Sequence, residues 1–171
     1  DEKPCIGGVM GQLDKTLPTN DCSACIFSPK LQALAQNPNI EILAYSKIEG
    51  REGESGKFTG KVRRKARYVD AEKCTSCGAC AQKCPTKVPN EYNFENDLRK
   101  AIYKDYAQGI PSVYTIDTTN CRVFNGKKCG VCAKVCPAGA IDYEQQDIIE
   151  EINVGAVVMA PGYELFNTAH V

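Results

Sequence analysis

Hydrophobic and polar residues alternate over two stretches in the first half of the chain, residues 40–48 and 56–69. Alternation with a period of two on either side of the turn-rich segment GREGESG is typical of a two-stranded antiparallel ribbon. The basic run Arg63-Arg64-Lys65 falls inside the second stretch, where we expect a solvated strand edge. We therefore expect a two-stranded ribbon that leads into the cysteine-rich segment.

Four other segments carry a secondary-structure signal. Residues 28–36 (SPKLQALAQ) combine a serine cap, a proline in the first turn and a following Asn-Pro, which predicts a short helix. Residues 93–107 have apolar side chains four positions apart, which predicts a second helix. We expect strands over 148–154 and over the continuous apolar run 156–160, the latter of the buried type. The apolar positions in 93–107 are Leu98, Ile102 and Tyr106.

The charge and cysteine content exclude several classes of protein. Lys plus Arg and Asp plus Glu number 21 each, which gives no electrostatic case for nucleic acid or an anionic membrane. No apolar run approaches about 18 residues, so we expect no direct membrane insertion. The start DEKPCIGGVM does not resemble a secretory signal, and 11 cysteines cannot all pair within one chain. We therefore expect a cytoplasmic protein whose cysteines are metal ligands or redox thiols.

Eight of the cysteines form a tandem repeat. Residues 74–85 have the pattern C-x-x-C-x-x-C-x-x-x-C-P, and residues 121–137 repeat it with seven residues between the first two cysteines. The hexapeptide VDAEKC that opens the first copy aligns with IDTTNC in the second, which favours Cys121 as a ligand despite the insertion.

The spacing of these cysteines is typical of iron-sulfur ligation. Three closely spaced thiolates converge on one centre, and in two-cluster ferredoxins the cysteine before proline reaches the other cluster. Paired Cys-x-x-Cys elements also bind structural zinc, but zinc needs neither the third cysteine nor the repeated Cys-Pro ending. With only cysteine ligands there is no open position for substrate, so we expect one-electron transfer and no catalytic residues. Cluster I is assigned to Cys74, Cys77, Cys80 and Cys136, and cluster II to Cys121, Cys129, Cys132 and Cys84.

The remaining cysteines, Cys5, Cys22 and Cys25, leave three interpretations open. Cys22-x-x-Cys25 is suited to a redox dithiol at the start of a helix. All three cysteines with a further ligand from Asp21, solvent or another chain segment would form a third metal centre. The third interpretation is ordinary buried thiols.

Several longer motifs resemble one family. They are residues 4–22 (PCIGGVMGQLDKTLPTNDC), Ser28-Pro29-Lys30, the cysteine repeat, residues 99–103 (RKAIY) and residues 155–163. Over nearly the whole chain the pattern is similar to the A subunit of heterodisulfide reductase and its homologues in sulfate reducers and anaerobic aromatic degraders.

The resemblance implies an α+β fold. A bacterial two-[4Fe-4S] ferredoxin-like domain, residues 66–145, would be inserted between partial segments of an α/β thioredoxin-reductase-like FAD domain, residues 1–65 and 146–171. Asp1 would bind the adenosine ribose, Gly7-Gly8 would lie against the FAD, and Pro161-Gly162 would form a flavin-domain turn. Because no G-x-G-x-x-G motif occurs, we expect FAD only where other segments or another chain complete the site.

The expected function is electron transfer through two [4Fe-4S] clusters within a heterodisulfide-reductase-like flavin and iron-sulfur complex. The chain would be an electron-transfer subunit or a fragment of that oxidoreductase, with other subunits and the remaining flavin-domain segments as partners. The alternative is a flavin-linked dithiol/disulfide oxidoreductase that uses Cys22 and Cys25. The one histidine, His170, is expected to be a tail residue without a role.

Overall fold

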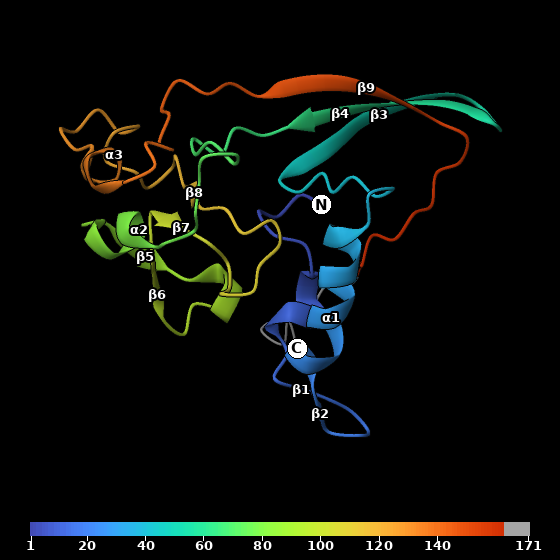
Figure 1. Ribbon diagram of the computed structural model, residues 1–171, viewed down its shortest axis with the longest axis horizontal. Coiled ribbons are helices and arrows are strands. Elements are labelled where there is room, and N and C mark those ends of the chain that lie inside the picture. Colours follow the sequence, from blue (N-terminus) through green and yellow to red (C-terminus); the bar gives the residue numbers. More distant parts are fainter. Residues whose placement is uncertain (163–171) are drawn as a thin grey trace, which may run out of the picture.

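The computed structural model describes residues 1–162, and His170 lies outside them. The part of the chain that carries the eight repeat cysteines, here called the cysteine-rich unit, lies on one side, and α1 (Ser23–Gln36) lies on the other (Figure 1). A three-stranded sheet arches above both. No helix within residues 1–162 is long and apolar enough to cross a membrane. The elements in chain order are η1 Gly8–Gln12, β1 Lys15–Thr16, β2 Asp21–Cys22, α1 Ser23–Gln36, β3 Ser46–Glu54, β4 Lys57–Arg64, α2 Ala79–Lys83, β5 Lys87–Pro89, η2 Glu91–Asn93, β6 Leu98–Lys100, β7 Ile102–Tyr103, β8 Thr115–Ile116, α3 Val131–Val135 and β9 Ile148–Val154.

The expected ribbon is present, but its first strand is displaced, since β3 begins at Ser46 and includes most of the segment expected to be a turn. The two strands belong to a sheet of order β3-β4-β9 with both pairings antiparallel. Gly53 has φ 96°, and a Cβ there would lie 2.1 Å from the Lys57 carbonyl oxygen, so the end of the ribbon requires glycine. At the opposite end of β4, Arg64 is the register partner of Ile148 in β9. The strands that lead into and out of the cysteine-rich unit are therefore neighbours.

The expectation that Arg63-Arg64-Lys65 forms a strand edge is wrong, because β9 pairs along the other side of β4 and makes it the central strand. Arg63 Nε lies 2.6 Å from a carboxylate oxygen of Glu49, and Arg63 Nη1 lies 3.4 Å from Asp147. The basic side chains therefore meet acidic ones from the strands on both sides.

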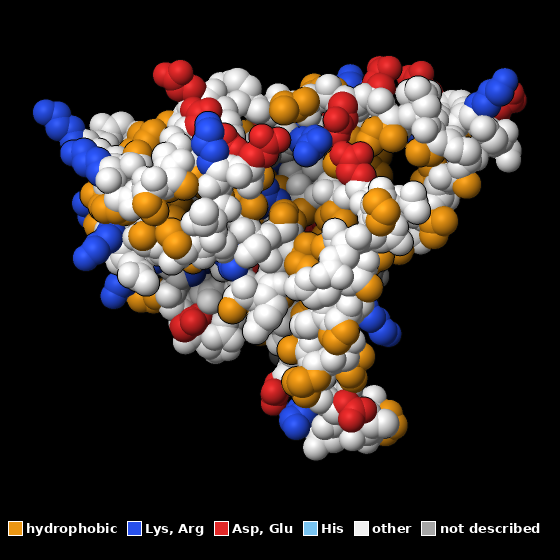
Figure 2. All heavy atoms as spheres, in the orientation of Figure 1, with side chains coloured by type: hydrophobic (Ala, Val, Ile, Leu, Met, Phe, Trp, Pro, Cys, Tyr) orange, Lys and Arg blue, Asp and Glu red, His pale blue; other side chains and the backbone are white. Residues whose placement is uncertain are grey.

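The helix expected over 28–36 is longer, since α1 begins at Ser23. Cys22, not Ser28, is the N-cap, and its sulfur accepts a hydrogen bond from the backbone N–H of Cys25. Pro29 consequently lies inside the helix. The predicted end is confirmed, with Asn37 extended before the proline. Phe27 faces the interior, while hydrophobic side chains also gather on the outer surface over α1 (Figure 2).

The helix expected over 93–107 is wrong, because the segment contains the short strands β6 and β7. Leu98 is 62% exposed, whereas Ile102, four positions later, is 2% exposed. β6 pairs with β5 and β7 pairs with β8, so tertiary pairing overrides the helical spacing of the apolar residues.

The strand over 148–154 is confirmed as β9, but the buried strand expected over 156–160 is wrong. Val158 is 90% exposed and Met159 is 76% exposed. A continuous apolar run forms a buried strand only where neighbouring strands pair with it, and no strand within residues 1–162 pairs with this one.

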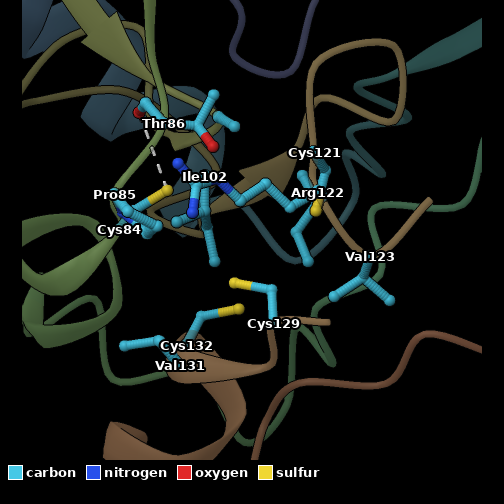
Figure 3. A pocket seen from close by; sticks show the side chains of 12 residues that line it. Cys84, Pro85, Thr86, Ile102, Cys121, Arg122, Val123, Cys129, Val131 and Cys132 are labelled. Carbon is cyan, nitrogen blue, oxygen red and sulfur yellow. Dashed lines mark hydrogen bonds between the residues drawn. The ribbon is translucent and has the colours of Figure 1, made fainter. Parts of the chain in front are cut away.

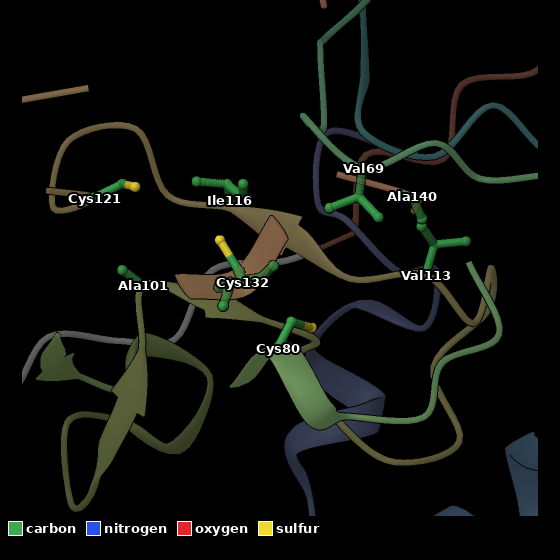
Figure 4. Close-up of a cluster of buried hydrophobic side chains, with 9 residues drawn as sticks. Val69, Cys80, Ala101, Val113, Ile116, Cys121, Cys132 and Ala140 are labelled. Carbon is green, nitrogen blue, oxygen red and sulfur yellow. The ribbon is translucent and has the colours of Figure 1, made fainter. Parts of the chain in front are cut away.

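The core of the cysteine-rich unit combines apolar side chains with three cysteines (Figure 4). Tyr68 and Tyr114, which precede the two cysteine motifs, pack against this core. The buried members are Val69, Cys80, Ala101, Ile102, Val113, Ile116, Cys121, Cys132 and Ala140.

The strand assignment predicts unequal effects for two truncations of similar size. Ile102→Ala should lower the free energy of unfolding by about 2–4 kcal/mol, because it removes buried methylene groups. Leu98→Ala should change it by only about 0.5 kcal/mol, since the side chain is exposed. Anaerobic urea unfolding checks both, and equal losses would contradict the two-strand geometry.

Candidate iron-sulfur site

The two copies of the cysteine motif begin with the same backbone turn. The N–H of Cys74 donates to the carbonyl of Asp70 at 3.0 Å, and that of Cys121 donates to the carbonyl of Asp117 at 2.9 Å. Each aspartate side chain also accepts a hydrogen bond from a backbone N–H inside its own turn. Cys121 therefore holds the same structural position as Cys74 despite the insertion that follows it.

Each copy continues into a short helix that begins at a left-handed glycine. Gly78 precedes α2 with φ 80°, and Gly130 precedes α3 with φ 109°. The backbone N–H two residues beyond Cys77, and the corresponding N–H beyond Cys129, hydrogen-bond to the cysteine sulfur and lower its pKa. These N–H groups point at the sulfurs and favour the thiolate form that binds metal.

Four cysteines line one cavity between the two copies. It encloses about 330 Å³, including its open mouth, and the four sulfur atoms surround the same space (Figure 3). One of them, Cys84, comes from the first copy and the other three from the second. Ile102 and Ile116 form part of the apolar wall. The cysteines are Cys84, Cys121, Cys129 and Cys132, the set assigned to cluster II.

The cysteines assigned to cluster I lie together on the α2 side. Burial, with smaller contributions from the thiols of Cys74, Cys132 and Cys136, raises the pKa of Cys80 to about 11. Tyr114 lies near enough to Cys74, Cys77 and Cys80 for these thiols to raise its own pKa. The Cys136 sulfur, from the second copy, accepts a hydrogen bond from the backbone N–H of Ala140 at 3.3 Å.

The family comparison agrees with this arrangement, since residues 67–90 match the family of 4Fe-4S binding domains. Three relatives match nearly the whole chain. The iron-sulfur A subunit of CoB–CoM heterodisulfide reductase from Methanocaldococcus jannaschii is 44% identical over 98% of this chain and 25% of its own length. The A 2 iron-sulfur subunit of the same reductase from Methanopyrus kandleri is 48% identical over 96% of this chain and 24% of its own length. A protein of Archaeoglobus profundus, named as similar to the heterodisulfide reductase A subunit, is 42% identical over 99% of this chain and 27% of its own length.

The chain is homologous to part of the A subunit of heterodisulfide reductase. It spans about a quarter of the length of these relatives. The cysteine-rich unit of this homologue is a ferredoxin-like 4Fe-4S domain within a mixed α/β structure.

Three polar side chains near the cysteines were not singled out from the sequence. The Tyr143 hydroxyl lies 2.9 Å from the Cys132 sulfur, and burial raises its pKa above the ordinary range. Lys100 Nζ donates to the Cys84 carbonyl oxygen at 2.7 Å, and Lys104 Nζ donates to the Ser76 hydroxyl at 3.0 Å. Lys100 belongs to the RKAIY motif, but no local pattern indicates any of these three contacts, because the fold brings each residue to its partner.

Cys22 and Cys25 form a close pair at the start of α1, where their sulfur atoms are 2.7 Å apart. The hydrogen bond from the Cys25 thiol lowers the pKa of Cys22, and the same contact raises the pKa of Cys25. An N-cap thiolate is also stabilised by the backbone N–H groups of the first helical turn. The pair therefore has the asymmetry of a nucleophilic and a resolving thiol.

Cys5 occupies a different environment from this pair. It is 2% exposed, its thiol lies 3.7 Å from the Pro111 carbonyl oxygen, and burial raises its pKa to about 11. Within residues 1–162, no three histidine, cysteine, aspartate or glutamate side chains are close enough to share a single metal ion. The third centre thus remains a prediction for Cys5, Cys22 and Cys25.

The residues expected to contact FAD have other partners here. The Asp1 carboxylate accepts a hydrogen bond from the Lys3 backbone N–H at 2.9 Å. A Cβ at Gly7 would lie 2.9 Å from the Tyr106 hydroxyl, so packing against an aromatic ring requires glycine there. Gly8, Pro161 and Gly162 do not line the cysteine cavity. None of the five residues lines the hollow beside Arg99 and Asp105, and their contact with FAD stays a prediction.

The thiol pair predicts an order of alkylation at about pH 7. Cys22 should react with iodoacetamide before Cys25, although Cys25 is more exposed, because more of Cys22 is thiolate. The alkylation rate of Cys22 should rise with pH, and the midpoint of this rise should lie at a lower pH than for an ordinary thiol. Cys25→Ala should slow the reaction of Cys22 by removing the hydrogen bond that the Cys25 thiol donates. Peptide mass mapping over time checks the order.

Cys5→Ser is the matched control, because it removes a buried thiol and should leave both rates unchanged. Faster labelling of Cys25 than of Cys22 in the unmodified chain would contradict the asymmetry.

Proposed function

We propose that the chain transfers electrons one at a time through two [4Fe-4S] clusters within a complex like heterodisulfide reductase. The observation that carries the proposal is the cavity between the copies, which is lined by four cysteines and otherwise largely by apolar side chains. The donor set fits the group, since thiolates are the ligands of [4Fe-4S] clusters. Cys84, Cys121, Cys129 and Cys132 would hold one cluster.

The second cluster would be held by the cysteines on the α2 side. Cys80 lies near Cys74 of its own copy and near Cys132 and Cys136 of the second copy. Tyr114 lies near Cys74, Cys77 and Cys80, which supports this assignment. Because α2 packs against α3, the two centres would be neighbours. The ligands are Cys74, Cys77, Cys80 and Cys136.

The chain's own residues would bind the clusters, shield them and stabilise negative charge. The cysteine thiolates supply every ligand, and Ile102 and Ile116 limit access of water to the cavity. Backbone N–H groups at the starts of α2 and α3 donate to sulfur. When bound, the clusters supply reversible one-electron redox chemistry without bond making or breaking.

The proposed partners follow from the relatives. Two of them are named as iron-sulfur subunits of heterodisulfide reductase, so we assign this chain to one subunit of a similar complex. FAD would bind where further flavin-domain segments meet residues 1–65 and 146–171, including Asp1, Gly7, Gly8, Pro161 and Gly162. A third iron-sulfur centre at Cys5, Cys22 and Cys25 would require a ligand from elsewhere or a rearrangement of Cys5.

Metal analysis of anaerobically purified protein tests the proposal. We expect about eight irons with equal sulfide, little zinc, and spin-coupled signals after reduction with dithionite. Cys121→Ser should lose close to half of the iron, because it removes one cavity ligand. Cys5→Ser, a buried cysteine outside both sets, is the matched control and should keep all of it.

Zinc without sulfide, or reduction without any change in absorbance or spin signal, would refute the proposal. About twelve irons, reduced by Cys5→Ser or Cys22→Ser, would instead add the third centre.

The second candidate function is a flavin-linked dithiol/disulfide oxidoreductase. It is favoured by the 2.7 Å contact between Cys22 and Cys25 and by the opposite pKa shifts of the two thiols. Alkylation of this pair should then abolish disulfide reduction by the assembled complex while the iron content stays unchanged. Full activity after alkylation would exclude it.

A further inference from the structure

The surroundings of the two proposed clusters differ at one buried polar contact. Cys132 is 9% exposed, and its sulfur lies 2.9 Å from the hydroxyl of half-buried Tyr143. A cysteine bound to iron is a thiolate and has no proton to donate, so in the ligated state the hydroxyl must be the donor. The phenol also packs against Phe124 at a centroid distance of 6.0 Å, which fixes its orientation.

In the other set, the backbone N–H of Ala140 donates to the Cys136 sulfur at 3.3 Å, which is longer than the 2.9 Å contact between Tyr143 and Cys132. The Thr75 hydroxyl hydrogen-bonds to Cys77, but both residues are exposed, so water competes with the contact. The position in the first copy that corresponds to Tyr143, eleven residues after Cys80, is Glu91, which is paired with Arg99 at 2.6 Å. The repeat is therefore asymmetric at this point.

The lysine side chains do not reverse this difference between the two sets of cysteines. Lys100 donates to the carbonyl of Cys84 in one set, and Lys104 donates to Ser76, between two cysteines of the other set. Each set thus has one lysine ammonium group, and both groups contact an oxygen atom and not a cysteine sulfur. Arg122 adds a guanidinium to the wall of the cavity and lowers the pKa of Cys129.

We infer that the hydrogen bond from Tyr143 to the Cys132 thiolate gives cluster II a higher reduction potential than cluster I. One-electron reduction adds one negative charge and breaks no bond, and a donor to a ligand sulfur stabilises that charge. An electron from a low-potential one-electron donor then resides mainly on cluster II. This inference rests on the proposed function. Tyr143 would act through the Cys132 thiolate and determine which cluster holds the electron.

A mediated redox titration of the 171-residue chain, followed by spin resonance, tests the inference. We expect two reduction steps in the unmodified chain. Tyr143→Phe should lower the step at higher potential, so that the reduced fraction at a fixed potential falls several-fold. A tenfold change would correspond to about 59 mV for a one-electron couple. The step at lower potential should not move.

Tyr68→Phe is the matched control. Tyr68 packs against the same Phe124 at 4.5 Å, and its hydroxyl donates to no cysteine within residues 1–162. It should leave both steps unchanged. If Tyr143→Phe loses iron, 3-fluorotyrosine at position 143 keeps the ring and strengthens the donor, so the higher step should then rise.

Iron and sulfide analysis of each variant separates the two ways of failing. An unmodified chain without clusters would refute the proposed function itself. Intact clusters whose potentials are the same in all variants would overturn only the role of Tyr143. A shift confined to the lower step would overturn the order of the two potentials.

Discussion

The exchange of one cysteine between the two copies of the repeat is the constraint on which the rest of the structure depends. Cys84 of the first copy lines a cavity with three cysteines of the second, and Cys136 of the second lies beside Cys80 of the first. The copies can only meet in this way if α2 and α3 pack against each other. Thiolates brought this close repel one another, so the arrangement favours a bound positive centre that neutralises them.

The flanking segments are arranged around this unit by two connections. Arg64 at the end of β4 pairs with Ile148 at the start of β9, so the chain leaves and rejoins the sheet at adjacent positions. The second connection is Arg67, which donates to the Pro4 carbonyl at 2.6 Å and to the fully buried Thr115 hydroxyl at 3.0 Å. These bonds offset the cost of burying the guanidinium.

The secondary-structure predictions succeeded where local signals and tertiary pairing agreed. The second strand of the ribbon and the strand at 148–154 pair with each other as β4 and β9. The first strand lies farther along the chain than its alternation indicated, because residues 50–54 pair with β4 instead of forming the turn. The helix expected over 93–107 failed because short strands of the cysteine unit pair across the chain, which placed Ile102 in the core and Leu98 in solvent. The start of α1 was missed because cysteine is an unusual N-cap.

The sequence alone indicated iron-sulfur ligation, because the repeated spacing of its cysteines before proline is typical of 4Fe-4S binding domains. It also determined the family, since motifs such as PCIGGVMGQLDKTLPTNDC are too long to arise by chance. Only the tertiary structure decided what surrounds the sulfurs. Tyr143 contacts the Cys132 sulfur, Lys100 contacts the Cys84 carbonyl oxygen, and Arg122 lines the cavity. Such contacts depend on packing that no local pattern encodes.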